Sequence, residues 1–432
     1  MSLKSWGNYP IIENKVSLFK NEVELQNILK QKKNYIPYGN GRSYGDSALA
    51  NNIIHTKNYN FFLNFDEKKG ILECTAGILI SDIIETFLPR GWFIGVSPGT
   101  KFATVGGAIA SDVHGKNHHL MGTFSKTILS FKIMLSNGEI TECSSIKNQE
   151  LFAVTCGGMG LTGIIISAKL KLFKISSSRI NQTTIRTSCL EETLEVFEAF
   201  KDFSYSVAWV DCFANDKEIG RSIFVVGEHA KDGILKLCKR SNLSFLAHDA
   251  SFLLNKYTMS IFNKLYYRKN FAKVTNQNVD IDSFFYPLDN IRDWNKIYGT
   301  NGFIQYQFVL PKSKSMIGLK KILKKISLGR KYSYLAVLKN FGAINDNWLS
   351  FPMEGYSLSL DFKVEKGLFS FLDELDKIII QNGGRIYLTK DSRVSKINFE
   401  KGYKKIKDFR VFRRDLGLDS KFNSLQSIRL EL

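Results

Sequence analysis

The sequence predicts an α+β protein built from two domains, with a final segment that returns to the first of them. The chain has 432 residues, and at about 150 residues per domain this length suggests two or three domains. Hydrophobic residues make up 44% and charged residues 23%, which is the balance of a folded globular protein. From residue 35 to 175, short β-forming runs alternate with glycine-rich turns and short helical stretches. Near Ser176 the glycine density falls and aromatic residues become more frequent, so we expect a second domain to begin there.

The first part of the chain contains one expected helix and several expected strands. An apolar stripe predicts a helix over residues 15–30. The runs at residues 71–75 and 131–135 predict strands, because they are rich in residues that suit a pleated surface. Asn137-Gly138 predicts a hairpin turn that joins the second of these strands to another over residues 139–143.

The aromatic-rich second part is expected to mix amphipathic helices with strands. Periodicity predicts helices over residues 191–201 and 316–326 and a strand over residues 303–310, where apolar and polar residues alternate. The second helix places Leu319, Ile322, Leu323 and Ile326 on one face and four lysines opposite. A further helix runs through Leu368, Leu372, Leu375 and Ile379 and ends at Asn382-Gly383-Gly384, before a strand over residues 385–388.

Charge and cysteine content limit the functional classes. Lysine and arginine outnumber acidic residues by 60 to 41, and the formal net charge of +19 favours anionic partners or simply a soluble surface. The six cysteines include no C-x-x-C pair, which argues against a zinc site and a disulfide scaffold. No apolar run reaches the roughly 18 residues of a membrane span, and the first residues do not form a secretory signal. We therefore expect a cytoplasmic protein, or one lying on the inner face of the cytoplasmic membrane.

A glycine-rich loop follows the first short apolar run after residue 34. It reads Pro37-Tyr38-Gly39-Asn40-Gly41-Arg42-Ser43-Tyr44-Gly45-Asp46-Ser47. Glycine permits positive φ and close backbone approach, so successive N–H groups can turn toward one anion, such as a pyrophosphate. Tyr44 stands where the Rossmann fingerprint needs a third glycine, and no G-K-[ST] follows as in a Walker loop. Taken alone, the loop is equally compatible with an ordinary turn.

Two further glycine-rich segments suggest a flat, phosphate-bearing ligand threaded against backbone. One includes Gly99 and continues through Thr104-Val105-Gly106-Gly107 to His114-Gly115-Lys116-Asn117-His118-His119. The other is Gly157-Gly158-Met159-Gly160-Leu161-Thr162-Gly163-Ile164-Ile165. His114 and His118 have the spacing of two metal ligands on a helix, but Gly115 weakens such a helix, so we expect no metal. The histidines then belong either to a polar loop or to a site beside a redox cofactor.

Together these motifs resemble the flavin-binding domain of the vanillyl-alcohol-oxidase, or PCMH-type, FAD-linked oxidoreductases. Within that superfamily the chain is most similar to the decaprenylphosphoryl-β-D-ribose 2-oxidase family, and the H-G-K-N-H-H run is specific to it. The resemblance covers nearly the whole chain. Outside the flavin domain it rests on Asn255-Lys256-Tyr257-Thr258, Tyr267-Arg268-Lys269, Phe285-Tyr286-Pro287-Leu288-Asp289, Gln305-Tyr306-Gln307-Phe308 and Thr389-Lys390-Asp391-Ser392-Arg393.

The resemblance implies a two-domain PCMH-type FAD-binding fold with an antiparallel-sheet substrate domain flanked by helices. The FAD-binding domain would be residues 1–178, the substrate-binding domain residues 179–385, and residues 386–432 would return to the FAD domain. The FAD would be held by residues Pro37 to Ser47, Gly99, residues Thr104 to Gly107, residues His114 to Asn117, Ile165 and Tyr387.

Two departures from the family pattern concern the cofactor and the substrate. Many relatives bind FAD covalently through a histidine that directly follows the first G-x-G, but Arg42 stands there, so we expect non-covalent FAD. Mycobacterial members carry cysteine at the position of Ser359 and asparagine is the family residue at Ser357. These changes leave the flavin chemistry intact and bear on the substrate pocket.

Oxidation of a secondary alcohol requires groups that position a carbon and manage a proton. Lys390 is the first candidate to bind the hydroxyl or take its proton; the alternative is a surface lysine paired with Asp391. Lys339 lies in an apolar run where a lysine is costly unless paired, so it is expected to bind sugar or phosphate. Gln307 and Gln305 share one strand face, which lines the sugar pocket or forms a polar outer surface. Tyr44 and His114 are candidates for the junction of flavin and substrate.

The function implied is oxidation of the C2 hydroxyl of a polyprenyl-phosphoryl-β-D-ribose to the 2-keto sugar. A separate NAD(P)H-dependent keto-reductase would complete the epimerisation to an arabinose donor for the cell envelope. Basic residues at 312–331 and 396–414 could rest on anionic lipid, or could be solvated helix faces. One alternative is an aldonolactone or soluble sugar oxidase of the same superfamily. Another is a nucleic-acid-binding protein, which we do not expect because no nucleic-acid-binding motif is present.

Overall fold

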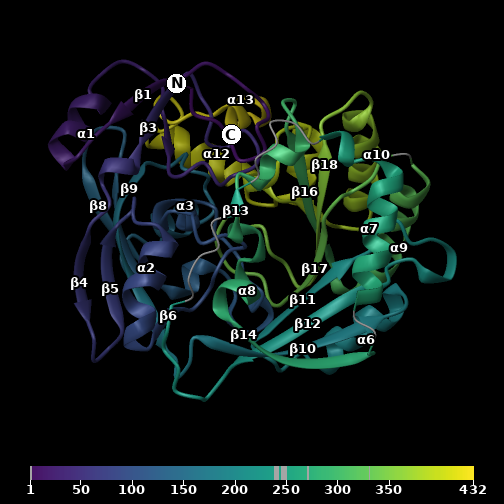
Figure 1. Ribbon diagram of the computed structural model, residues 1–432. Helices are drawn as coiled ribbons and strands as arrows, with labels where there is room; N and C mark the ends of the chain where they lie inside the picture. Colours follow the sequence, from purple (N-terminus) through teal and green to yellow (C-terminus); the bar gives the residue numbers. More distant parts are fainter. Residues whose placement is uncertain (1, 238–242, 245–250, 270–271, 330) are drawn as a thin grey trace.

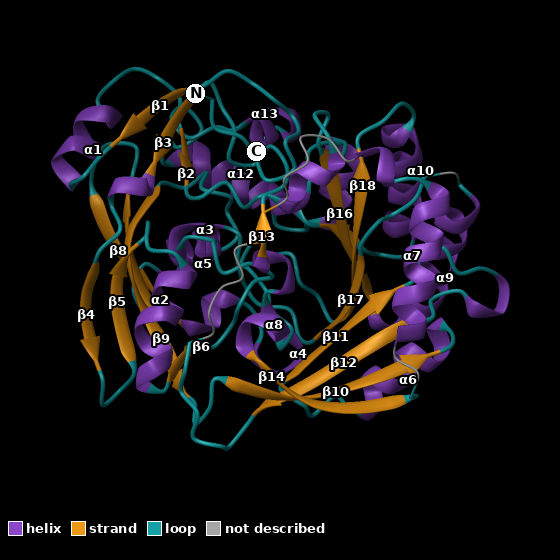
Figure 2. Cartoon of the chain, viewed as in Figure 1, coloured by secondary structure: helices purple, strands orange, loops and turns teal. Residues whose placement is uncertain are grey.

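Two groups of β-sheets stand side by side, with helices packed against each and a crowded seam between them (Figure 1 and Figure 2). The structure, a computed structural model, describes residues 2–237, 243–244, 251–269, 272–329 and 331–432. Both ends of the chain lie on the same side of the molecule, above the smaller sheets in the view of Figure 1.

The first group consists of a small parallel sheet and a larger antiparallel sheet whose strands differ in length. The parallel sheet has the order β1 (Lys15–Leu18), β3 (Asn52–His55) and β2 (Ile36–Tyr38). The six-stranded sheet runs β4 (Phe62–Asp66), β5 (Ile71–Thr75), β9 (Ile164–Lys174), β7 (Ile128–Met134) and β8 (Ile140–Ser144), with β6 (Trp92–Ile94) also paired to β9. Its helices are α2 (Ile80–Phe87), α3 (Val105–Ala110), α4 (His118–Met121) and α5 (Gln149–Thr155).

The helix predicted over residues 15–30 is wrong in its first part. Residues 15–18 form β1, whose backbone groups pair in parallel with β3, and only Glu22–Leu29 form helix α1. The boundary is set by Asn21, whose side-chain oxygen accepts a hydrogen bond from the Glu24 N–H at 2.9 Å and so begins the helix. The apolar stripe in the sequence therefore spans two elements.

The strands and turn predicted around residues 71–143 are confirmed. Residues 71–75 form β5, and the hairpin of β7 and β8 turns through Asn137-Gly138. Gly138 has a φ of 85°, a conformation that glycine adopts without steric cost.

The second group is one antiparallel sheet of eight strands. Its order is β14 (Val274–Asp280), β10 (Arg179–Thr187), β12 (Ser222–His229), β11 (Tyr205–Val210), β17 (Ala336–Phe341), β18 (Gly355–Lys363), β16 (Phe303–Pro311) and β19 (Arg385–Ile386). A two-stranded parallel pair, β13 (Leu243–Ser244) with β15 (Ile291–Arg292), lies outside it. The predicted strand over residues 303–310 is confirmed, whereas the strand predicted over residues 385–388 ends at Ile386 and gives way to a 3₁₀ turn, η8 (Leu388–Lys390).

Helices α6 (Leu190–Ala199), α9 (Lys312–Leu328) and α10 (Leu368–Gln381) contact this sheet and confirm the predicted amphipathic helices. The apolar face expected on α9 is buried at Leu319, Ile322, Leu323 and Ile326. Two more helices, α7 (Lys256–Lys269) and α8 (Ile281–Phe285), lie in the long connection between β12 and β16. No helix in the described ranges is long and apolar enough to cross a membrane.

The last residues of the chain pack back onto the first sheets through helices α11 (Lys396–Gly402), α12 (Ile406–Asp415) and α13 (Leu425–Leu430). Tyr35 forms a parallel bridge with Phe422. Arg429 on α13 pairs with Asp46 at 2.9 Å and with Asp391 at 2.8 Å. These contacts fix residues 388–391 against the loop that follows β2.

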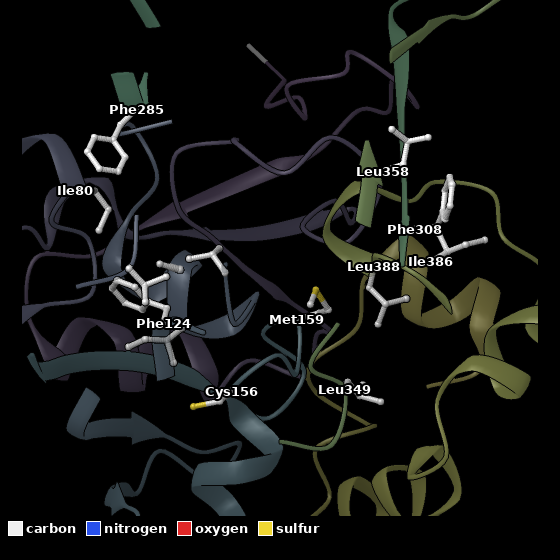
Figure 3. Close-up of a cluster of buried hydrophobic side chains, with 14 of the residues drawn as sticks. Ile80, Phe124, Cys156, Met159, Phe285, Phe308, Leu349, Leu358, Ile386 and Leu388 are labelled. Carbon is white, nitrogen blue, oxygen red and sulfur yellow. The ribbon is translucent and has the colours of Figure 1, made fainter. Parts of the chain in front are cut away.

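One hydrophobic core runs through the seam between the two groups. In Figure 3, Met159 lies between Phe124 and Cys156 of the first group on one side and Leu358, Ile386 and Leu388 on the other, and all of them belong to one cluster. Cys74, Cys143, Cys156 and Cys212 are buried and unbridged, and Cys238 lies outside the described residues. The shared core holds the facing surfaces of the two groups in one arrangement.

Candidate active site

A cavity of about 680 Å³ opens between the two groups of sheets. One side, here called the glycine wall, is formed by most of the residues in the segments 37–44, 98–107 and 159–165. The opposite side, here called the polar wall, is formed by one face of the eight-stranded sheet together with Lys390. Alternate residues of the strands reach the polar wall, which is the spacing expected for one face of a sheet. They are Gln182, Val207, Trp209, Ile223, Val225, Gln305, Gln307, Val337, Lys339 and Ser359.

The glycine wall depends on backbone that packs too closely for side chains. A Cβ atom on Gly39 would lie 2.3 Å from Thr104 Oγ1, and one on Gly106 would lie 2.9 Å from the Ala76 Cβ. Thr104 also caps α3 by accepting a hydrogen bond from the Gly107 N–H at 3.1 Å. Asn40 ties the two loops together by donating to the Phe102 carbonyl at 2.9 Å. The result is a thin wall of backbone facing the cavity.

Arg42 occupies the position where many flavoproteins carry a histidine. Its guanidinium lies 4.0 Å from the Trp6 ring centroid and 5.1 Å from that of Phe102, which is cation–π geometry. Its buried Nε has no hydrogen-bond partner in the described part of the chain. Arg42 therefore lines the cavity and carries a buried donor that no described residue uses.

Gly45 and Asp46 face away from the cavity, although both were expected to hold the cofactor. A Cβ on Gly45 would lie 1.7 Å from the Asp391 carbonyl oxygen, so this glycine allows the loop to touch residues 389–391. The Asp46 carboxylate is used by Arg429. Both residues join the glycine wall to the segment that carries Lys390.

His114 lies on the cavity beside β16 and is held by Gln307. The Gln307 amide Nε2 lies 2.9 Å from His114 Nε2 and 3.2 Å from Ser357 Oγ. Burial lowers the pKa of His114 well below its usual range, and the charge of nearby Lys339 lowers it further, so the imidazole is neutral. With the amide donating to Nε2, the proton resides on Nδ1, which has no partner among the described residues. The alternative of a polar outer face for Gln305 and Gln307 is wrong, since both line the cavity.

Lys390 lies at the end of η8 and contacts the aromatic ring of Tyr44. Its Nζ is 3.7 Å from the Tyr44 ring centroid. Burial lowers the pKa of Lys390 to about 7, with Asp361 raising it and Lys339 lowering it further. The alternative of a surface lysine paired with Asp391 is wrong, because the Asp391 carboxylate pairs with Arg429. Burial raises the pKa of Tyr44 well above its usual range, so its phenol stays protonated.

Two more lysines bring positive charge to the cavity. Burial lowers the pKa of Lys339 to about 8, and burial together with Lys339 lowers the pKa of Lys116 to about 7. The Lys116 ammonium donates to the Phe284 carbonyl and lies 4.4 Å from the Phe284 ring centroid. Lysines that cluster in a concave site favour an anionic ligand, which would restore their full charge.

The structure brings most of the expected site residues to the cavity. Those that line it are Pro37, Tyr38, Gly39, Asn40, Gly41, Arg42, Ser43, Tyr44, Ser47, Gly99, Thr104, Gly106, Gly107, His114, Lys116, Ile165, Gln307, Lys339, Ser359, Tyr387 and Lys390. Those that do not are Gly45, Asp46, Val105, Gly115, Asn117 and Ser357. Val105 is buried in the hydrophobic core, Asn117 donates to the Gly95 carbonyl at 2.7 Å, and Ser357 accepts a hydrogen bond from Gln307.

Two carboxylates at the site were not expected from the sequence. Asp361 accepts a hydrogen bond from Gln305 at 2.8 Å, and burial raises its pKa to about 7. Asp289 accepts from Thr100 Oγ1 and from the Lys101 N–H, both at 2.8 Å, and lines the cavity. The sequence could have indicated Asp361, because it follows Ser359, an expected site residue, by two positions on the same strand. Asp289 stands in a segment that carries the family resemblance, but nothing in the segment assigned it to the site, which it reaches from a 3₁₀ turn, η6 (Pro287–Asn290).

Known proteins with similar sequences include several oxidases and a D-lactate dehydrogenase. The FAD binding domain family matches residues 15–144. Decaprenylphosphoryl-β-D-ribose oxidase of Mycolicibacterium smegmatis is 32% identical over 449 aligned residues, covering 100% of this chain and 97% of that protein. L-gulonolactone oxidase of Bos taurus is 28% identical over 38% of this chain and 37% of its own, and a putative D-arabinono-1,4-lactone oxidase of Neurospora crassa is 27% identical over 31% and 24%.

The residues at the cavity fit FAD, which is the cofactor of this chain. The glycine wall offers bare backbone for a phosphate-bearing dinucleotide, since a Cβ on Gly99 would meet nothing within 4 Å. Two buried donors, Arg42 Nε and His114 Nδ1, have no partner in the described chain and border the cavity. Both are suited to the oxygen and nitrogen acceptors of a flavin.

Proposed function

Because the chain belongs to the decaprenylphosphoryl-β-D-ribose oxidase family of FAD-dependent oxidoreductases, which act on CH–OH groups, we propose that it oxidises the C2 hydroxyl of a polyprenyl-phosphoryl-β-D-ribose to the 2-keto sugar. The observation that carries the proposal is the pairing of two unlike walls. A backbone wall suited to a dinucleotide faces a wall of lysine and glutamine side chains suited to a phosphorylated sugar.

The chain's own residues divide the work of binding and proton transfer. Bound FAD supplies the hydride acceptor. The residues proposed to hold it are those of the glycine wall with Arg42, His114, Lys116, Ile165 and Tyr387. Arg42 cannot form a histidyl bond, so we propose that the FAD is held without a covalent link and that acid precipitation releases it. In domain terms, residues 1–178 with 386–432 hold the cofactor and residues 179–385 hold the sugar.

Lys390 is proposed to accept the proton of the reacting hydroxyl. A pKa of about 7 leaves a large fraction of its amine neutral at physiological pH, as a general base requires. The Tyr44 ring beneath Nζ and the loop contact at Gly45 hold the amine in place. His114, neutral and oriented by Gln307, keeps its proton on Nδ1, and Tyr44 remains a protonated phenol.

Lys339 and Gln307 are proposed to orient the phosphorylated sugar, with Ser359 beside them and Ser357 acting through Gln307. Lys339 on β17 and Ser359 on β18 line the same face of the cavity. Lys339 pairs with Ser357, and Ser359 lies two residues further along β18. A phosphate close to Lys339 would stabilise its charged form, so binding should raise the pKa of that lysine. Arginine is not required, because lysine serves as a point charge for phosphate.

The 2-keto product requires a partner if it is to become an arabinose donor. A ketone at C2 becomes the opposite epimer when a hydride is delivered to the other face, so we propose a separate NAD(P)H-dependent keto-reductase. We also propose peripheral contact with an anionic membrane, because a polyprenyl tail does not leave the bilayer unaided.

The product itself tests the proposed function. Holoenzyme is incubated with polyprenyl-phosphoryl ribose and an artificial electron acceptor, and the product is then reduced with borodeuteride. We expect one deuterium, located at C2, in a mixture of ribose and arabinose after hydrolysis. Deuterium at another carbon would contradict the assigned position. Turnover of free aldonolactones without lipid-linked ribose would instead support the lactone oxidase alternative, in line with the partial similarity to L-gulonolactone oxidase.

A further inference from the structure

Helix α7 exposes an apolar face at the rim of the cavity. Tyr257, Ile261 and Leu265 are spaced four residues apart and are 78%, 59% and 65% exposed. Phe262, 53% exposed, lies beside them, and Phe252 in the preceding 3₁₀ turn is 72% exposed. Large apolar side chains exposed singly are ordinary, but a group of them on one helix marks an interaction surface.

The opposite side of α7 is anchored in the second sheet group. Asn263 is buried and donates to Asp211 Oδ1 at 2.9 Å. The Tyr267 hydroxyl donates to the Thr187 carbonyl at 3.0 Å, and the Tyr266 ring meets Trp209 edge-on at 4.9 Å. The helix is therefore a docked element with one unpartnered face.

The charge of α7 identifies the kind of partner. Its fourteen residues include Lys256, Lys264, Arg268 and Lys269 and no acidic residue. Within the described chain none of these four forms an ion pair with a carboxylate. In the two basic segments expected to meet lipid, by contrast, part of the charge is used within the protein. Residues 312–331 pair Lys312, Lys320, Lys325 and Lys331 with glutamates, and Arg330 lies outside the described residues. In residues 396–414, Arg413 is fully buried and Lys396 and Arg410 pair with glutamates.

The position of α7 connects this surface to the site. Phe262 and Tyr266 both line the cavity while remaining 53% and 40% exposed, so apolar side chains continue from the cavity to the exposed face. A ligand whose polar head lies at Lys339 and Lys390 could extend an apolar tail along this path.

We propose that the face of α7 formed by Tyr257, Ile261, Phe262 and Leu265 lies in the surface of an anionic lipid bilayer and receives the polyprenyl chain of the substrate from it. An apolar stripe flanked by lysine and arginine is the composition of a helix that lies in the membrane interface. The basic residues supply attraction to anionic headgroups, at about 1 kcal/mol each near the surface. The proposal rests on the lipid-linked substrate proposed above.

The test is co-sedimentation of holoenzyme with vesicles of phosphatidylglycerol and phosphatidylcholine, at low and high salt. We expect binding that weakens in high salt and on pure phosphatidylcholine. The double variant I261D/L265D should bind about tenfold more weakly, since two apolar side chains no longer enter the lipid. Neither residue lines the cavity. Matched controls are I317D on α9 and I397D on α11, which are 54% and 66% exposed and should bind as the wild type does.

The outcomes separate the surface from the reaction. Equal binding by I261D/L265D and wild type, or loss of binding in a control variant alone, would overturn the proposal. A wild-type dimer that the double variant dissociates, with no vesicle binding, would assign the face to a second copy instead. Tyr257→Trp offers a second readout, because its emission should shift to shorter wavelength on adding anionic vesicles, and an unchanged spectrum would count against insertion.

Activity with a short-chain, water-soluble polyprenyl-phosphoryl ribose distinguishes failure of the surface from failure of the proposed function. The double variant should retain FAD and oxidise this substrate as the wild type does, while losing about tenfold in rate on long-chain substrate in vesicles. Equal rates on long-chain substrate would contradict the role of α7. Absence of wild-type activity with both substrates would instead contradict the proposed function, whatever the vesicles show.

Discussion

The two walls of the cavity are built in opposite ways. The glycine wall presents backbone from three loops that lie within the first 165 residues, and its shape comes from contacts such as that of Gly39 with Thr104. The polar wall presents side chains collected from six strands and from η8, and its properties come from burying several lysines together. One wall is thus defined by the absence of side chains and the other by their electrostatic coupling. Substitutions in or beside the glycine wall should therefore change stability and cofactor retention. Substitutions in the polar wall should change proton transfer and substrate binding.

The largest expected effect is on the polar wall. Lys390→Met removes the proposed base while keeping a similar length, so anaerobic reduction of the flavin by substrate should slow by about 10²- to 10⁴-fold. Stopped-flow absorbance measures that rate. Lys321→Met, on the exposed face of α9, is the matched control and should react as the wild type does. A Lys390→Met rate within a factor of about three would remove Lys390 from the assigned role.

Next to the glycine wall the comparable change is Gly45→Ala, at the residue that directly follows the wall's first segment. The added Cβ would lie 1.7 Å from the Asp391 carbonyl, and backbone cannot move aside as a flexible side chain can. We expect destabilisation of about 3 kcal/mol and loss of bound FAD, measured by thermal unfolding and by flavin content. Gly99→Ala, where no atom lies within 4 Å, should leave the melting temperature of the apoprotein unchanged. Equal melting temperatures for the two variants would contradict the close-contact account of this wall.

The pH dependence of kcat/KM should report two lysines of the polar wall. The proposed base is active when neutral, so activity should rise as pH passes the lowered pKa of Lys390, about 7. Lys339 binds phosphate when charged, so binding should weaken as pH passes its lowered pKa of about 8. The pH profile of kcat/KM is therefore a narrow bell between these two values, and each limb approaches a tenfold change per pH unit. Lys339→Met should remove the upper limb and keep a lower limb that is shifted to higher pH, because Lys339 no longer lowers the pKa of Lys390. A profile flat from pH 6 to pH 9 would contradict both assignments.

The smallest expected effect is that of Ser359→Cys. The side chain lines the cavity, and sulfur for oxygen changes its volume little, so kcat/KM should change by less than about tenfold. The new thiol should react with a soluble alkylating reagent, and bound substrate should slow that reaction. Loss of nearly all activity in this variant would show that the hydroxyl is required for catalysis.

The contrast between the walls also explains what the sequence could predict. The glycine wall was predictable because its residues are neighbours in the chain: residues 37–44 read as one motif and form one surface. The polar wall was only partly predictable, since Lys390 and Lys339 gain their character from burial beside each other, although they are 51 positions apart in the sequence. Gly45 and Asp46 were assigned to the cofactor because they stand in the motif, yet they face the segment at Asp391. Residues 15–18 were misread because a parallel pairing with β3 is not visible in local periodicity.

The central claim is that one cavity holds FAD on its glycine wall and a lipid-linked ribose on its polar wall. Anaerobic mixing of the yellow holoenzyme with polyprenyl-phosphoryl ribose tests it most directly, with flavin absorbance near its visible maximum followed in time. The account predicts rapid bleaching by this substrate and none by free ribose or by aldonolactones. Flavin that stays oxidised with the lipid-linked sugar but bleaches with a free lactone would contradict it.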